Sequence, residues 1–231
     1  MDSIAHNLEV IRQCIRAAAV RSCRDPESIR LVAVSKTHPG EAVREAHAAG
    51  QVLFGENKVQ EALGKIPLLP PSLEWHFIGH LQSNKIRKAL PLFHLFHGVD
   101  NGALAAQIDR VAGECGSPAR VLLEVNVSGE ETKFGFQPDR LRAEISGLLA
   151  LSHVRILGLM TMAPYAADPQ LAKPYFAALR RLRDELEQQT GHPLPELSMG
   201  MSGDFEAAIE EGSTLVRVGT AIFGERPQKP A

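Results

Sequence analysis

Eight short apolar segments recur along this 231-residue chain, and residues with helical periodicity follow them. Apolar runs of this length are typical of strands buried on both faces of a parallel sheet. Eight units of strand and helix close into a barrel that typically needs about 250 residues. The sequence therefore predicts an α/β fold, a single (β/α)8 TIM barrel, with strands at about 29–36, 52–56, 75–79, 92–99, 121–127, 155–160, 196–201 and 215–219.

The residues before the first strand predict one further helix. Apolar side chains recur there at a spacing of three or four, at Ile4, Leu8, Ile11, Ile15 and Ala18. Because this segment precedes any strand, we expect an extra N-terminal helix, residues 1–24, packed on the barrel. We expect residues 1–231 to form one domain with a frayed tail at 227–231.

Composition argues against several classes of partner. The formal net charge of −2 gives no electrostatic case for binding nucleic acid or an anionic membrane. No segment approaches about 18 consecutive apolar residues, and the N-terminus lacks a signal-peptide pattern. The three cysteines, Cys14, Cys23 and Cys115, have no metal-ligand or redox spacing. We expect a cytoplasmic monomer with no membrane or nucleic-acid partner.

Lys36 closes the first apolar run, and Pro39 ends that strand within a residue or two because proline cannot continue a ladder. The carboxyl-terminal rim of such a barrel carries the chemistry. An amine beside a low-dielectric wall deprotonates more readily and can form a Schiff base with an aldehyde such as pyridoxal phosphate. The alternative is a lysine whose side chain merely reaches water.

Two turns rich in glycine and hydroxyl groups follow the seventh and eighth strands, the usual phosphate-binding positions of these barrels. They contain Ser202 with Gly203, and Gly219 with Thr220. Ser202 is expected to cap the next helix. The carboxylates that follow it, Asp204 and Glu206, are expected to point away from a bound anion. Together the two turns predict a phosphate site.

Arg217 lies in an otherwise apolar strand, where an inward-facing guanidinium is costly to desolvate without a partner. Two interpretations remain open. Arg217 forms a structural ion pair with a carboxylate such as Glu56 or Glu124, or it faces an acceptor on a bound ligand.

The sequence gives no reason to expect a metal site. His76 and His80 are four residues apart, but the residues between them are typical of a strand, so the two histidines do not share one helical face. Each is expected to be a core or rim histidine.

Several motifs together resemble the pyridoxal phosphate homeostasis proteins, whose barrel is related to the N-terminal domain of alanine racemase. The match extends from about residue 30 to residue 226. Its motifs are VAVSKT (32–37), FGENKVQE (54–61), WHFIGHLQSNK (75–85), GLMTM (158–162), SMGMS (198–202) and VRVGTAIFG (216–224).

The resemblance implies a pyridoxal 5'-phosphate site and a role for each of its residues. Lys36 would carry the cofactor as an internal aldimine, and Arg217 would face the pyridine nitrogen. The phosphate would be bound by Ser202, Gly219 and Thr220. Asn57 would lie near the ring, with Val34 and Met201 as apolar neighbours.

Two functions of different kinds follow from the resemblance. The first is a protein of intracellular vitamin B6 homeostasis that holds pyridoxal phosphate without turnover, with the cofactor and the apo-enzymes that use it as partners. The second is an amino-acid racemase. An arginine opposite the ring nitrogen cannot accept a proton and weakens the ring as an electron sink, which favours the first. A sugar-phosphate enzyme that forms a Schiff base at Lys36 is a third, weaker alternative.

Overall fold

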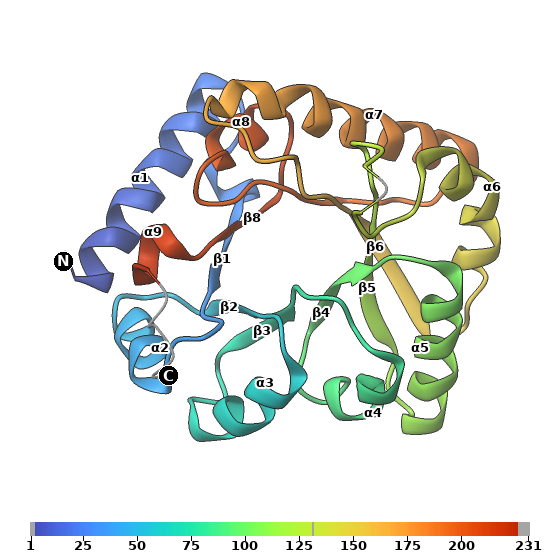
Figure 1. The fold of residues 1–231 in the computed structure, drawn as a ribbon, viewed down its shortest axis with the longest axis horizontal. Coiled ribbons are helices and arrows are strands. Elements are labelled where there is room, and N and C mark those ends of the chain that lie inside the picture. Colours follow the sequence, from blue (N-terminus) through green and yellow to red (C-terminus); the bar gives the residue numbers. More distant parts are fainter. Residues whose placement is uncertain (1–2, 131, 226–231) are drawn as a thin grey trace.

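The computed structural model describes residues 3–130 and 132–225, and it contains a closed barrel of parallel strands. The strands follow one another around the barrel in chain order, and β8 pairs with β1 (Figure 1). The predicted barrel is confirmed. Its strands are β1 (Arg30–Val34), β2 (Leu53–Glu56), β3 (Glu74–Phe77), β4 (Leu95–Val99), β5 (Ala119–Glu124), β6 (Val154–Met160), β7 (Glu196–Ser198) and β8 (Leu215–Val218).

Helices surround the barrel, as expected of repeated strand and helix units. The α-helices are α1 (Ile4–Arg21), α2 (Gly40–Ala48), α3 (Val59–Lys65), α4 (Ile86–Ala89), α5 (Gly102–Cys115), α6 (Pro138–Leu149), α7 (Lys173–Thr190), α8 (Phe205–Glu210) and α9 (Thr220–Phe223). Short 3-10 helices are η1 (Pro26–Ser28), η2 (Ile66–Leu68), η3 (Ser83–Lys85) and η4 (Pro169–Ala172).

The strands are apolar on both sides because they bury side chains in two separate places. A large core lies between the strands and the helices and contains Phe54, Trp75 and Phe96. A smaller apolar cluster consists of side chains from different strands: Val32, Leu53, Leu95, Leu122, Met160 and Leu215. In the paired strands, members of this second cluster lie level with inward-facing residues of the adjacent strands: Val32 with Arg217, and Leu95 with His76. The cluster therefore fills the barrel interior.

The extra N-terminal helix, α1, is confirmed, although it is shorter than the predicted 1–24. The hydroxyl of Ser3 accepts a hydrogen bond from the His6 N–H and caps the helix. One face of α1 is buried against α2, α8 and α9 through Leu8, Ile11, Ile15 and Ala18. Arg24 then donates to the carbonyls of Ile209 and Ser213, which ties the end of this segment to the α8 region.

Two predicted strands end three residues earlier than expected. β7 stops at Ser198, and the chain turns at Gly200, which has a φ of 91°. β5 stops at Glu124, and Val125 then bridges to Phe136 where the next loop folds back. The predicted tail at 227–231 lies outside the described residues.

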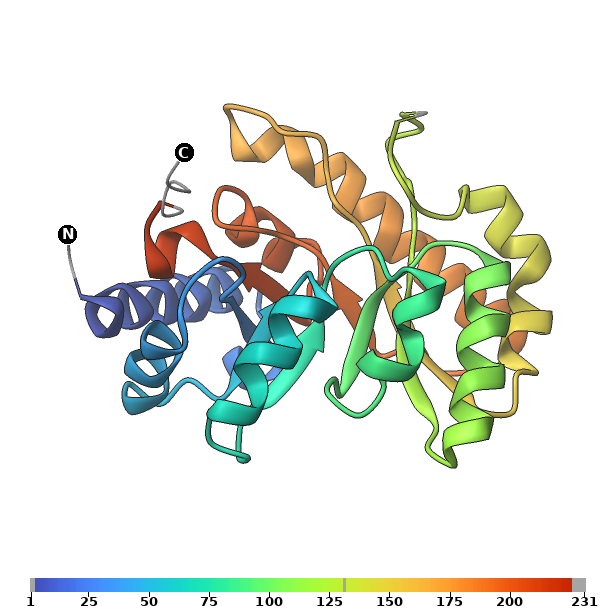
Figure 2. The same cartoon turned by 60° about the horizontal axis from the view of Figure 1, so that its bottom comes forward.

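The carboxyl ends of the strands lie at one end of the barrel, which we call the mouth. Figure 2 shows the loop before α6 and the start of the α7 segment projecting at one end of the molecule. Within the described part of the chain, no helix is both long and apolar enough to cross a bilayer.

Candidate functional site

Lys36 lies at the mouth, two residues beyond the end of β1. Val34 and Ser35 are buried, and Lys36 begins a turn in which the His38 N–H donates to the Ser35 carbonyl over 3.1 Å. Thr37 has a φ of 70°, an unusual conformation for a branched residue. The lysine is therefore half-buried on a tightly turned segment, where the sequence predicted the end of the strand.

A buried ion-pair network fixes this turn from below. The Lys65 ammonium donates to Glu56 over 2.8 Å, to Glu61 over 2.7 Å and to the Ser35 carbonyl over 3.0 Å. Glu61 also accepts the Thr37 N–H, and Glu56 accepts the Ser35 hydroxyl, each over 2.7 Å. Burial raises the pKa of Glu56, an effect that Lys65 and Ser35 partly oppose. Both neighbours of Lys36 are thus held by charged groups, of which the sequence named Glu56 only as a partner for Arg217.

Asn57 lies beside the Lys36 turn. Val34 pairs with Gly55 in the register of β1 and β2, so Lys36 and Asn57 each follow that pair by two residues. A methyl group on Gly79 would lie 2.4 Å from the Asn57 carbonyl oxygen, so only glycine allows the loop after β3 to approach the Asn57 backbone this closely. The Oδ1 atom of Asn57 is buried and accepts no hydrogen bond from the residues that the structure describes. An orphaned amide oxygen is costly, and a ligand donor would satisfy it.

Arg217 is 6% exposed and lies in β8 at the same level as Val32 of β1. Its Nη1 donates to the Ser198 hydroxyl and its Nη2 to the Thr161 carbonyl, the latter over 3.0 Å. Burial lowers the pKa of Arg217 to about 10. Glu124 and Asp204 act on Arg217 electrostatically and oppose this shift.

Of the two interpretations of Arg217, the ion pair with Glu56 or Glu124 is not formed. Glu56 instead pairs with Lys65. Among the described residues, no ion pair joins Glu124 to Arg217. Burial, followed by repulsion from Asp100, raises the pKa of Glu124 to about 7. The guanidinium is therefore held by a hydroxyl and a carbonyl, and these two hydrogen bonds use two of its five N–H donors.

The turns after β7 and β8 come together. The Ser202 hydroxyl accepts the N–H of Gly219 over 3.3 Å and the N–H of Ala221 over 3.4 Å. A methyl group on Gly219 would lie 3.3 Å from Cβ and from the carbonyl oxygen of Val34, so this turn also lies against the end of β1. Thr220 begins α9 and is exposed. The structure thus brings together Ser202, Gly219 and Val34, with Thr220 next to them.

One detail of the predicted phosphate turn is wrong. Ser202 does not cap α8, because that helix starts at Phe205 with Asp204 at the capping position, and the Ser202 hydroxyl reaches across to the β8 turn. The Asp204 Oδ1 accepts the Met201 N–H over 2.6 Å, and burial raises the pKa of Asp204. Glu206 does point outward and pairs with Arg21 over 2.7 Å. The Met201 residue is 39% exposed, at the edge of the site.

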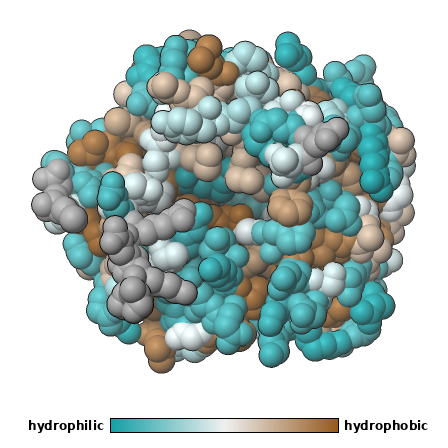
Figure 3. Space-filling model, in the orientation of Figure 1, coloured by the Kyte–Doolittle hydropathy of each residue, from teal (hydrophilic) through white to brown (hydrophobic). Residues whose placement is uncertain are grey.

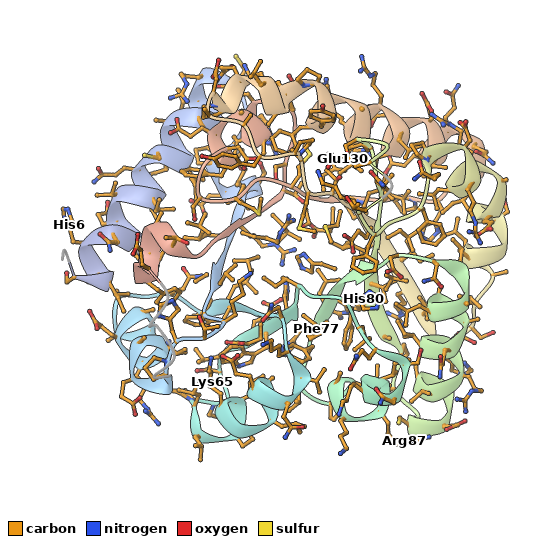
Figure 4. All side chains as sticks on the ribbon, viewed as in Figure 1. His6, Lys65, Phe77, His80, Arg87 and Glu130 are labelled. Carbon is orange, nitrogen blue, oxygen red and sulfur yellow. The ribbon has the colours of Figure 1, made fainter. Side chains whose placement is uncertain are left out.

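The loop over 128–136 touches the rim on the far side of the mouth. The Phe134 ring stacks on the His80 ring with centroids 4.6 Å apart, and His80 Nδ1 lies 3.0 Å from Asp100. Figure 4 shows His80 and Glu130 on the same side of the barrel, and Figure 3 shows this end hollowed near its centre. No cluster of three metal-ligating side chains occurs among the described residues. The prediction that His76 is a core or rim histidine is confirmed, because its side chain is buried.

A closed parallel barrel with a lysine, an asparagine, an arginine and a hydroxyl-glycine turn at its carboxyl end belongs to the class of barrels that bind a small molecule at the mouth. The family model for the N-terminal domain of alanine racemase matches residues 1–227. The chain is 46% identical over 220 residues to the pyridoxal phosphate homeostasis protein of Aquifex aeolicus, covering 95% of this chain and 96% of that protein. The chain therefore belongs to the family of pyridoxal phosphate homeostasis proteins.

Solved structures agree with this assignment. PipY of Synechococcus elongatus, solved with pyridoxal phosphate bound, is 45% identical with a TM-score of 0.84, covering 96% of this chain and 100% of that one. Alanine racemase of Corynebacterium glutamicum is 20% identical with a TM-score of 0.75, covering 96% of this chain and 60% of the racemase. The likeness to the racemase concerns the fold alone.

Proposed function

We propose that this protein binds pyridoxal 5'-phosphate at the mouth of the barrel, as a Schiff base on Lys36, and serves in intracellular pyridoxal phosphate homeostasis without turnover of its own. The observation that carries the proposal is the meeting of Ser202 and Gly219 against Val34, two residues before Lys36. A phosphate group held at that turn would lie beside the lysine. The relatives' names and the ligand of PipY support the same function.

The residues at the mouth fit this cofactor. When bound, pyridoxal phosphate supplies an aldehyde that condenses with amines and a ring that accepts electrons. Lys36 offers the amine, and the orphaned Oδ1 of Asn57 offers a buried acceptor. Arg217 presents donors only, so it orients a ring nitrogen as an acceptor and provides no proton-accepting group there. Met201 and Val34 would contact the ring as apolar neighbours.

The proposal also covers the proteins that receive the cofactor, the oligomeric state and the cellular compartment. We propose that the recipients of the cofactor are apo-enzymes that depend on it, and that the protein acts as a monomer in the cytoplasm. The three cysteines are free, which fits a reducing compartment. Exposed large apolar side chains of the described residues are distributed over several elements, including Val20 of α1 and Leu171 of η4, so they do not argue for a subunit interface.

The function is tested by titrating the purified protein with pyridoxal phosphate and following absorbance near the visible range. The double variant Ser202→Ala/Thr220→Ala should retain the cofactor at least about tenfold more weakly, because hydrogen bonds to a charged phosphate contribute roughly 1.5–3 kcal/mol each. Exposed Ser83→Ala, on η3, serves as the control. A wild-type protein that stays colourless contradicts the function, and unchanged retention in the double variant moves the phosphate elsewhere.

Racemisation of alanine or serine should be absent or reduced to a trace. Returning a proton on the face opposite Lys36 needs a second acid-base group. Neither tyrosine is suited to this role, because Tyr165 is 98% exposed and Tyr175, on α7, packs against the large core between the strands and the helices. General acid-base assistance contributes roughly 10²–10⁴-fold. The measurement is D-alanine formation alongside deuterium entry at the α-carbon. Exchange without inversion agrees with one base, whereas inversion at about 10 s⁻¹ would support the racemase.

A further inference from the structure

A line of polar side chains starts at the half-exposed Glu74, crosses the buried interior of the barrel and ends at Arg217. Glu74 Oε1 lies 3.0 Å from His76 Nε2, and His76 Nδ1 lies 2.9 Å from His97 Nε2. His97 Nδ1 lies 2.9 Å from the Ser198 hydroxyl, which accepts from Arg217. These residues come from β3, β4, β7 and β8, so the line spans the barrel from one side to the other.

The chemistry of the two ends gives the line one direction. Arg217 can only donate, so the Ser198 hydroxyl accepts from it, and the hydrogen of that hydroxyl remains available for His97 Nδ1. His97 then carries its proton on Nε2 and donates to His76 Nδ1. His76 in turn carries its proton on Nε2 and donates to the Glu74 carboxylate. With neutral histidines, the opposite direction would place an unprotonated His76 nitrogen against that carboxylate, so it is excluded.

Burial supports the neutral form of both histidines. His97 is 0% exposed and His76 is 1% exposed, and burial lowers the pKa of each, well below its ordinary value for His97. The hydrogen bond from His76 is the main cause of the lowered pKa of Glu74, so this carboxylate is ionised. The line therefore joins a cation to an anion through neutral groups, and each member polarises the next.

The fold alone does not require these polar groups. The apolar interior cluster, which includes Leu95 of β4 and Leu53 of β2, fills the same barrel with aliphatic side chains. Burying polar side chains in such an interior carries a desolvation penalty, and apolar residues of similar volume often stabilise the folded state equally well. Arg217 is the only cation on the line, and the other members are placed where they hold its Nη1.

We propose that Ser198, His97, His76 and Glu74 are positioning residues of the cofactor site, which fix the Arg217 guanidinium from behind so that its remaining N–H donors face the ring of the bound cofactor. This inference rests on the proposed function. It assigns a role to Glu74, at the other end of the barrel, where Glu74 lines an open cavity of about 370 Å³ and its side chain is 41% exposed.

The direction of the line is tested first on the protein without added cofactor, by long-range ¹⁵N–¹H correlation of the histidine rings. We expect His76 and His97 both to be neutral with the proton on Nε2, and to remain so between about pH 6 and 8. Exposed His192 provides the comparison signal. A proton on Nδ1 of either ring, or a charged ring in this range, overturns the inference whatever the protein binds.

The effect on Arg217 is tested with three variants loaded with pyridoxal phosphate. Ser198→Ala and His97→Leu interrupt the line, and we expect roughly tenfold weaker retention and a shifted pH profile of the cofactor absorbance. His97→Gln should restore much of both, because a carboxamide offers one acceptor and one donor. His6→Leu is the control, since His6 is exposed on α1, outside the line.

The outcomes separate this inference from the proposed function. If the wild type binds the cofactor while Ser198→Ala keeps its retention and pH profile, the inference is wrong and the function stands. If the wild type does not bind the cofactor, the function is wrong, and the ring tautomers still decide the direction of the line. Should His97→Leu fail to fold, Ser198→Ala and His97→Gln give the same comparison, because each removes little volume.

Discussion

Borohydride reduction of the protein loaded with one equivalent of pyridoxal phosphate should place the covalent label on Lys36. The amine is half-buried at the carboxyl end of β1, beside the meeting point of Ser202 and Gly219, where the phosphate is proposed to bind. A phosphate held there raises the effective concentration of the aldehyde at this one amine, and a well-oriented group of this kind gains many orders of magnitude over a free one. Peptide mapping by mass spectrometry measures the labelled position.

Lys36→Arg should remove the label from this position completely, since a guanidinium keeps its charge and forms no such bond. Lys88→Arg, an exposed change on α4, should leave the labelling of Lys36 intact. If another lysine carries most of the label in the wild type, the assignment of Lys36 is wrong, even if the protein still binds the cofactor.

The sequence predicted the barrel and the neighbourhood of Lys36 because both follow from local patterns. Each strand is an apolar run that ends in glycine or polar residues, and parallel strands bring their carboxyl ends to one mouth. Ser202 and Gly219 are 17 residues apart, yet the barrel closure makes them neighbours, as the turns after strands seven and eight predicted. The roles of these residues in binding a cofactor remain proposals.

The groups that support the site could not be predicted, because they depend on register across the barrel. Lys65 is the last residue of α3 and resembles an ordinary basic residue at a helix end, yet it reaches back to Glu56 and Ser35. His97 and His76 lie on separate strands, and their contact follows only when both strands direct these side chains inward. In the sequence, each of these histidines is only a polar side chain within an apolar run, and nothing in the run identifies its partner.

The ends of strands were the least accurate part of the prediction, and this has a physical reason. The run 196–201 is apolar beyond the strand because Met199 is buried, and its N–H still donates to the Leu215 carbonyl of β8 over 3.2 Å. The Gly200 carbonyl accepts the Arg217 N–H over 3.0 Å, but the chain turns at Gly200, so hydrophobicity alone places the end of the strand too late. The same turn redirects Ser202 away from the α8 capping position and toward Gly219.

Glu124→Gln should stabilise the protein by roughly 3 kcal/mol at about pH 8 and by roughly 1 kcal/mol at about pH 5. Glu124 is 5% exposed, and burial raises the pKa of its carboxyl from 4.5 to about 7 in the folded chain. Between these two values the folded state holds a proton that the unfolded state has released. The free energy of unfolding therefore falls as the pH rises through this window and levels off above it.

Glutamine keeps the shape of the protonated carboxyl but cannot ionise, so the variant avoids the cost that grows in the wild type as the pH rises from 4.5 to about 7. Urea unfolding of both proteins without cofactor, at the two pH values, measures the difference. Glu41→Gln is the matched control, because the Glu41 side chain is 80% exposed and should change stability by less than about 0.5 kcal/mol at either pH. A stabilisation that does not grow with pH would show that the Glu124 carboxyl is ionised throughout and that Arg217 and the mouth solvate it well enough to offset its burial.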